Sequence, residues 1–288
     1  MSSVQTMKSW ARFIDSYESL PSSFKPYLKS FADTPSLFPY TVFIPPNNKW
    51  YANKTNSTII YIYDKKIVVL EKIKKDILPI CYHLDKIHYI ETGTVLLKSW
   101  FSIKGTDDGV STSSTIEYNA VNENLFKPFI ESARMHIQKS DDADIANELS
   151  KFNYLSSLNY KFMNYARRSI KPGQKVLCIV LQPIIQKKVL QIFNKVFYKK
   201  LSCSHIHILT DKELIIIKDG YGNYGGIWTY IPIDKITDTF VTESKDENIS
   251  CYTLKLANDD HINFYFTFSN TIALNALQIE LEKIKLHS

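Results

Sequence analysis

The sequence predicts an α+β protein made of two tandem antiparallel β-barrels or sandwiches, each closed by a C-terminal helix. Three observations carry this prediction: two phrases that recur along the chain, runs of β-branched residues, and a helical period at the end of each copy. The length of 288 residues suits one to two domains, each with its own core. A content of 44% hydrophobic and 22% charged residues indicates a globular chain rather than a disordered one.

The repeat consists of two related phrases that follow each other in both halves of the chain. Residues 63–71 read YDKKIVVLE, and residues 210–218 read TDKELIIIK. A second phrase follows in each half, LDKI at 84–87 and IDKI at 233–236, after nearly the same interval. Two matches in the same order and register indicate an internal duplication.

Each copy is expected to form a row of antiparallel strands and then one helix. An Asp-Lys turn leads into a β-branched run, at 67–70 in the first copy and at 214–217 in the second. Further strands are expected within residues 89–103, 240–242, 250–256 and 261–268.

The closing helices are predicted from apolar residues at helical spacing. In the second copy they run from Ile272 to Ile284, with Ser269 or Asn270 as the N-cap. In the first copy the helix covers about residues 125–133, with Asn122 as its cap.

Helical segments are also expected outside the two copies. Trp10, Phe13, Ile14 and Tyr17 predict a helical N-terminal segment over residues 1–37, interrupted by prolines. A helix from about residue 145 to 168 predicts a helical connector over 139–171. The two copies then occupy residues 38–138 and 172–288.

The phrase ILTDKELIIIKD, followed by YIPIDKI, several strands and a terminal helix, resembles the bacterial PH-like (pleckstrin-homology-like) domains. The first copy resembles the same fold through PYTVFIPP, DKKIVVLE, YHLDKI and GTVLLKSWFSIKG. The resemblance implies two tandem PH-like domains of a family of uncharacterised function. This fold hosts lipid binders, peptide binders and scaffolds, so it implies a binding role without naming the ligand.

Gly220, Gly222 and Gly225 complete a G-x-G-x-x-G pattern. In a dinucleotide site these glycines leave a strand and open a helix. Here the residues that follow, GIWTYIP at 226–232, alternate and end in proline, which predicts a strand. The glycines are therefore expected in a hairpin turn, and no nucleotide is predicted.

Other candidate chemistry is sparse. Cys203, His205 and His207 share one face of a predicted strand, but no second pair of ligands accompanies them, so a core strand is favoured and no metal is predicted. Cys81 and His83 are only two residues apart in a strand, and no G-x-S-x-G elbow occurs. Neither catalytic residues nor a cofactor are predicted, and an enzyme with an active site between the domains stays an alternative.

The most informative functional feature is a basic segment between the first two strands of the second copy. Residues 183–202 contain three aromatic residues, no acidic residue and five lysines: Lys187, Lys188, Lys195, Lys199 and Lys200. The corresponding place in the first copy contributes Lys49, Trp50 and Lys54. The PH-like resemblance implies that these loops supply lysines to a lipid headgroup, which makes all eight candidate ligand-binding residues.

A second interpretation of the basic segment is an amphipathic element with solvated lysines. Its apolar residues, Ile192, Val196, Phe197 and Leu201, would then belong to the core. The K-x-n-[KR]-x-R pattern of headgroup sites is not evident.

These observations predict a non-catalytic binding or adaptor protein that engages a protein partner through a sheet edge or a groove beside a terminal helix. The alternative is peripheral binding to anionic phospholipid, which a net charge of +6 permits. Nucleic acid is not expected, because 29 acidic residues balance the lysines and no nucleic-acid module occurs. The sequence lacks a signal-peptide pattern and a membrane-spanning apolar run, which predicts a cytoplasmic protein, at the inner face of the membrane under the lipid alternative.

Overall fold

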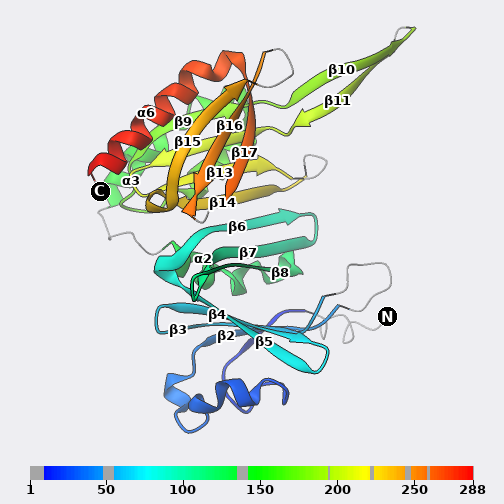
Figure 1. Ribbon diagram of the computed structural model, residues 1–288, viewed down its shortest axis with the longest axis vertical. Helices are drawn as coiled ribbons and strands as arrows, with labels where there is room; N and C mark the ends of the chain where they lie inside the picture. The colour runs from blue at the N-terminus through cyan, green and yellow to red at the C-terminus, as the bar shows by residue number, and fades with distance from the viewer. Residues whose placement is uncertain are drawn as a thin grey trace. The chain divides into compact units, whose positions relative to one another are not determined.

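The computed structural model divides the chain into two compact units, Met1–Ala133 and Arg134–Ser288 (Figure 1). It describes residues 10–47, 55–134, 142–193, 195–220, 224–243, 248–257 and 260–287. Both units consist mainly of antiparallel strands, and the last element of each is a helix. The predicted α+β class is confirmed, but the described strands form no closed barrel.

The first unit contains eight described strands. They are β1 Arg12–Ile14, β2 Tyr40–Ile44, β3 Thr58–Tyr63, β4 Lys66–Ile73, β5 Asp76–His83, β6 Ile87–Val95, β7 Lys98–Asp107 and β8 Val110–Asn119. Strands β1 to β5 pair antiparallel in sequence order, and β6, β7 and β8 pair as a meander. The 3₁₀ turn η3, Leu84–Lys86, connects β5 to β6 and contains the first three residues of the LDKI phrase.

Two hairpins of the first unit turn at pairs of residues in the left-handed region. Asp64 (φ 48°) and Lys65 (φ 57°) connect β3 to β4, and Asp108 (φ 46°) and Gly109 (φ 84°) connect β7 to β8. Two positive φ angles in a two-residue loop define a type I′ turn, whose twist matches that of the flanking strands. The Asp-Lys phrase therefore sets the register of β4, whose β-branched run is buried.

The predicted helical N-terminal segment is not shown. Residues 1–9 lie outside the described part, β1 follows, and the remaining elements are two 3₁₀ helices, η1 Lys25–Phe31 and η2 Pro35–Leu37. Arg12, Phe13 and Ile14 pair antiparallel with Phe43, Val42 and Thr41 of β2, and Phe13 is 47% exposed whereas Ile14 is only 2% exposed. Pairing with a neighbouring strand thus overrides the local helical spacing.

The first unit ends with the 3₁₀ helix η4, Ala120–Leu125, and the helix α2, Lys127–Ala133. The Asn119 side chain, rather than the predicted Asn122, caps η4, because its Oδ1 accepts a hydrogen bond from the Val121 N–H at 3.1 Å. Phe126 stacks on Tyr118 with ring centroids 3.7 Å apart, and Phe129 is fully buried. These rings attach the terminal helix to the meander.

The second unit contains nine described strands. They are β9 Val176–Gln182, β10 Ile185–Ile192, β11 Lys195–Ser202, β12 His205–Thr210, β13 Glu213–Asp219, β14 Gly226–Pro232, β15 Ile236–Glu243, β16 Ile249–Leu256 and β17 His261–Thr267. Strands β14, β13, β12 and β9 are neighbours in that order, and β15, β16 and β17 form a meander. The first three residues of the IDKI phrase form the 3₁₀ turn η6, Ile233–Lys235, between β14 and β15.

The glycine-rich segment is a hairpin connection, as predicted. Strands β13 and β14 are antiparallel, and Asp219 pairs with Gly226 at their ends. Gly225 has φ 75°, a backbone conformation that glycine adopts at no steric cost. Gly222 lies outside the described residues.

The connector is helical but not continuous. It consists of α3 Asp142–Ser150, α4 Leu155–Leu158 and α5 Tyr160–Ser169, where a single helix was expected. The break before α5 lies at Asn159, whose Oδ1 accepts from the Phe162 N–H at 3.1 Å as an N-cap. An asparagine that satisfies a free helix N–H favours a new helix start over continuation.

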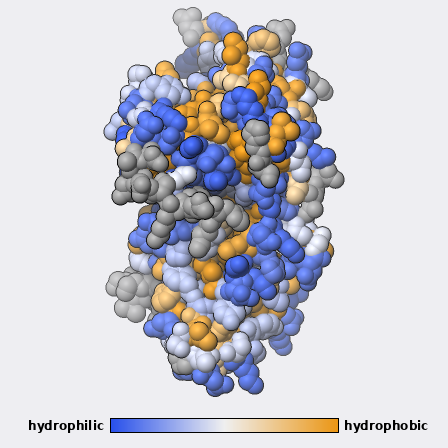
Figure 2. Space-filling view, turned by 90° about the vertical axis from the view of Figure 1, so that its left-hand side faces the viewer, coloured by the Kyte–Doolittle hydropathy of each residue, from blue (hydrophilic) through white to orange (hydrophobic). Residues whose placement is uncertain are grey.

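The helix α6, Thr271–His287, closes the second unit and packs against β9. Leu274, Leu277 and Leu281 are fully buried along one of its faces, at the spacing the sequence predicts. Its opposite face exposes Ile272 and Leu286, and Figure 2, seen from the side of α6, shows apolar patches among hydrophilic surface. None of the described helices is both long and apolar enough to cross a membrane.

Candidate binding surface

The basic segment forms a two-stranded antiparallel ribbon, β10–β11, that extends away from the other strands of the second unit (Figure 1). Lys187 pairs with Lys199, and Lys188 pairs with Tyr198. The register shifts between Lys188 and Leu190, so Val189 is an extra residue on β10, as in a β-bulge.

All five lysines of the ribbon are exposed. Paired residues lie on the same face of an antiparallel ribbon, so Lys187 and Lys199 share one face. Lys188 and Lys200 alternate onto the other face, where the Lys188 Nζ donates a hydrogen bond to the Gln191 Oε1. Because residues 183–202 include no carboxylate, both faces present positive charge.

The ribbon also exposes large apolar side chains, most of all at its tip. Phe193 is 94% exposed and has φ 52°. The left-handed conformation is less favourable by about 1–2 kcal/mol for a residue with a Cβ. The exposed Phe193 ring makes no packing contact that would offset this cost. Leu190 and Phe197 pair just behind the tip and are about half exposed.

The interpretation of this segment as an amphipathic element with solvated lysines placed Phe197 in the core. This is wrong, because the Phe197 side chain is 51% exposed. Val196 and Leu201 are half-buried. The side chain of Ile192 lies outside the described part.

The base of the ribbon is held by Gln182, a buried residue at the end of β9. Its Oε1 accepts hydrogen bonds from the Thr267 N–H (2.9 Å) and the Asn270 Nδ2 (2.8 Å), while its Nε2 donates to the Pro183 carbonyl (2.8 Å). Ile185 is buried beside it. These contacts attach the ribbon to the region between β17 and α6 and leave its outer part exposed.

Three candidate residues belong to the corresponding segment of the first copy. Lys49, Trp50 and Lys54 lie outside the described residues. The described flanks of that segment, Asn47 and Thr55, form an isolated antiparallel bridge with two backbone hydrogen bonds of 3.1 Å.

The two histidines of the Cys203, His205 and His207 cluster belong to an aromatic core, which confirms the core-strand interpretation for them. His207 lies 4.6 Å from the Phe264 ring and 5.1 Å from the Phe266 ring, measured between centroids. The His205 Nε2 donates to the Tyr265 carbonyl at 3.1 Å. Burial lowers the pKa of His205 to about 4 and that of His207 well below its usual value.

Both imidazoles are therefore neutral near pH 7, and neither ring nitrogen of His207 has a hydrogen-bond partner among the described residues. In that part of the chain no three His, Cys, Asp or Glu side chains come together as metal ligands.

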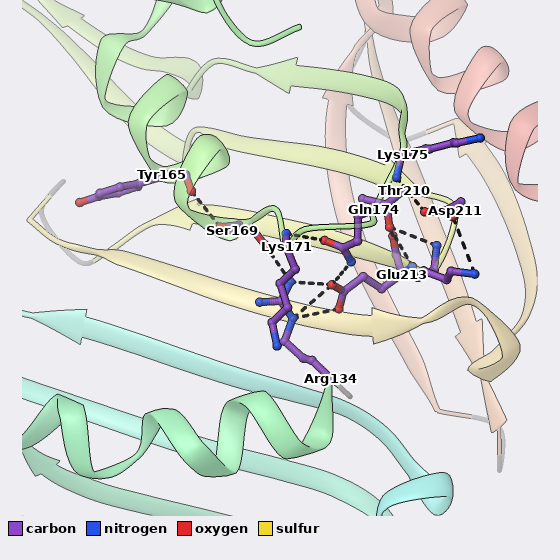
Figure 3. A network of polar contacts seen from close by, with 10 residues as sticks. Arg134, Tyr165, Ser169, Lys171, Gln174, Lys175, Thr210, Asp211 and Glu213 are labelled. Atoms are coloured by element: carbon purple, nitrogen blue, oxygen red, sulfur yellow. Dashed lines mark hydrogen bonds and ion pairs between the residues drawn. The ribbon is translucent and has the colours of Figure 1, made fainter. Parts of the chain in front are cut away.

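A buried polar network in the second unit was not predicted (Figure 3). Arg134 and Glu213 are each only 6% exposed in their side chains, and the Arg134 Nη2 and Nε contact the Glu213 Oε1 at 2.5 and 3.1 Å. The Gln174 Nε2 donates to the same oxygen at 2.6 Å, and the Arg134 Nη2 also donates to the Ser169 carbonyl at 2.8 Å. Tyr230 lies against the guanidinium, 3.8 Å from the Arg134 Cζ to its ring centroid.

This network joins the connector to the start of β13. The Thr210 Oγ1 accepts from the Glu213 N–H at 3.0 Å and donates to the Glu213 carbonyl at 2.9 Å. The Glu213 carboxylate thus accepts hydrogen bonds from two side chains, those of Arg134 and Gln174. A buried polar network whose members are hydrogen-bonded in this way favours one arrangement of the elements that it connects. A glutamate that opens an otherwise apolar strand, in TDKELIIIKD, was the only sequence signal for it.

Compared with models of known protein families, the chain matches none, and no curated protein sequence matches it significantly. Its function is therefore inferred from the geometry of its own residues.

Proposed function

We propose that the chain is a non-catalytic binding protein of two PH-like units, and that its β10–β11 ribbon binds the surface of an anionic phospholipid membrane. One observation carries this proposal: an exposed ribbon combines five lysines, no carboxylate and an apolar tip. Binding of a protein partner, which the sequence favours, is the competing hypothesis that the test below must distinguish from membrane binding.

The order of elements supports the PH-like assignment. In the first unit the strands β2 to β5 precede the meander β6–β8 and the helix α2. In the second unit β9, β12, β13 and β14 precede the meander β15–β17 and the helix α6. The ribbon is an insertion between the first and second of these strands, the loop that the resemblance associates with lipid headgroups.

The energetics favour a membrane over a surface of mixed charge. A lysine near an anionic lipid surface contributes roughly 1 kcal/mol, and this attraction falls off within a Debye length. The exposed side chains of Phe193, Leu190 and Phe197 can enter the interface, where aromatic rings are favoured. Apolar insertion at the tip would offset the cost of the left-handed conformation of Phe193.

The test is co-sedimentation with vesicles of phosphatidylcholine, alone or mixed with phosphatidylserine, at low and moderate salt. A variant with Lys187, Lys188, Lys199 and Lys200 changed to Gln should bind the anionic vesicles about thirtyfold more weakly, because one face of the ribbon brings two of these lysines to the membrane at roughly 1 kcal/mol each. The matched control changes four exposed lysines elsewhere to Gln and alters the net charge equally: Lys29, Lys75, Lys127 and Lys175.

Retention of binding by the control and its loss by the ribbon variant would support the proposal. Equal loss in both would mean that overall charge, not the ribbon, attracts the membrane. If the unmodified chain binds neither type of vesicle, the membrane proposal fails and a protein partner becomes the working hypothesis.

A further inference from the structure

A groove of about 320 Å³ runs beside β8 in the first unit. One wall consists of five consecutive β8 residues, Ser113 to Glu117. The other wall comes from the ends of β2, β3 and β4, and includes Ile44, Val69 and Glu71. Because consecutive residues of a strand point to opposite faces, five in a row can line a groove only along the edge of that strand.

Strand β8 is the edge strand on this side, and β7 lies between it and β6 (Figure 1). Its ten pairs with β7 continue from Asp107↔Val110 to Lys98↔Asn119 without a register shift. Natural edges are usually protected by proline, lysine or a bulge, but β8 reads VSTSSTIEYN and has none of these. A long, regular, unprotected edge is a template for another strand.

The turn geometry determines which backbone groups point toward the groove. Asp108 and Gly109 form a two-residue type I′ turn, so Asp107 and Val110 are the first hydrogen-bonded pair. The alternation then directs the N–H and C=O groups of Ser111, Ser113, Thr115 and Glu117 away from β7. The N–H and C=O groups of the residues between them are directed at β7 instead.

We infer that this groove binds an extended peptide of a partner protein, one that carries a basic residue and pairs with β8 as an added strand. Main-chain hydrogen bonds would supply affinity, and the groove would accept alternate side chains. This inference does not depend on the membrane role of the ribbon.

The lining of the groove determines the chemistry of the peptide. Its two charged side chains, Glu71 and Glu117, are both acidic. The Glu71 Oε1 accepts a hydrogen bond from the Asn56 Nδ2 at 2.8 Å, and the Glu117 Oε1 contacts the Lys98 Nζ at 2.6 Å. A carboxylate has about four acceptor positions, so each glutamate can also accept a hydrogen bond from a lysine or arginine of the peptide. Ile44, Val69 and Ile116 offer an apolar floor for one aliphatic side chain.

A second copy of the chain fits this groove less well than a basic peptide. The only charged side chain of β8 is Glu117, so pairing of two β8 edges would add a carboxylate to an already acidic groove. A lipid offers no backbone to the edge.

The test selects peptides from a phage-displayed random library on the immobilised full chain, and measures the resynthesised peptides by fluorescence anisotropy. Enriched peptides should contain Lys or Arg beside β-branched residues. Ser113→Pro removes one outward N–H without removing a hydrogen bond to β7, and should weaken their binding at least about tenfold. Ser113→Ala keeps the N–H and should bind as the wild type does.

Hydrogen exchange on the unmodified chain gives a second readout that needs no variant. A bound peptide should slow exchange at the Ser113 and Thr115 amides, whereas the Ser114 amide is already protected by β7. The inference is overturned if no peptide is enriched, or if the enriched peptides bind Ser113→Pro normally and leave these two amides unprotected.

Discussion

Acidification from about pH 7.5 to about pH 5 should lower the free energy of unfolding of the second unit by at least about 2 kcal/mol through His205 and His207. Burial holds the pKa of His205 at about 4 against 6.5 for an unperturbed histidine. One unit of pKa difference corresponds to about 1.4 kcal/mol, and the interval from 6.5 to 5 spans about 1.5 units. His207 is shifted in the same direction and adds to the effect.

The sign follows from proton binding. Folding lowers the pKa of both histidines, so the unfolded chain binds more protons below pH 6.5. The contribution of the two histidines to the free energy of unfolding is therefore fully present above that pH. It decreases as the pH falls toward the folded-state pKa. Lys218 on β13 acts in the same direction, because its positive charge also disfavours an imidazolium at either histidine.

Urea unfolding followed by circular dichroism at the two pH values measures this effect, with separate transitions fitted for the two units. The double variant His205→Gln/His207→Leu removes both titrating groups and should lose at least about 2 kcal/mol of the pH difference. Ile208→Val, a change on the same strand, should cost about 0.5–1.5 kcal/mol equally at both pH values. The reasoning is refuted if the double variant keeps the full pH difference of the wild type.

Two further predictions concern packing. Arg134→Met should lower the free energy of unfolding by about 3–5 kcal/mol, because it leaves Glu213 buried without its cation. Urea titration measures this loss. The double variant Arg134→Met/Glu213→Leu should recover most of it, whereas a purely steric effect of Arg134→Met would leave the double variant equally destabilised. Gly93→Ala should cost about 1–3 kcal/mol, because an added Cβ would lie 2.1 Å from the Trp100 Cζ2 and must displace the indole from its 3.0 Å hydrogen bond to Glu91. A near-UV circular dichroism spectrum and thermal midpoint unchanged from the wild type would contradict this second prediction.

The elements that the sequence predicted correctly are those with a strong local signal. The run at 214–217 lies in β13, and the helical period from Ile272 to Ile284 lies in α6. The glycines at 220 and 225 were assigned to a hairpin because the residues after them alternate as a strand does. In each case a few neighbouring residues contain the whole signal.

The wrong predictions have a common physical origin. Phe13 and Ile14 fit a helical spacing, but β2 is available as a partner and its backbone hydrogen bonds decide the conformation. Asn119 rather than Asn122 caps η4, because the end of β8 determines where the chain turns. Such choices depend on residues distant in the sequence.

The sequence by itself determined the α+β class, the turns and the accumulation of lysines at 187–200, because periodicity, backbone preference and charge belong to adjacent residues. Only the tertiary structure decided which lysines share a face of the ribbon, since this depends on strand register and on the bulge between Lys188 and Leu190. Likewise, Arg134 and Glu213 meet although they are 79 residues apart, and the β8 groove combines residues from four strands. Contacts of this kind arise from the packing of whole elements, which no local pattern of residues specifies.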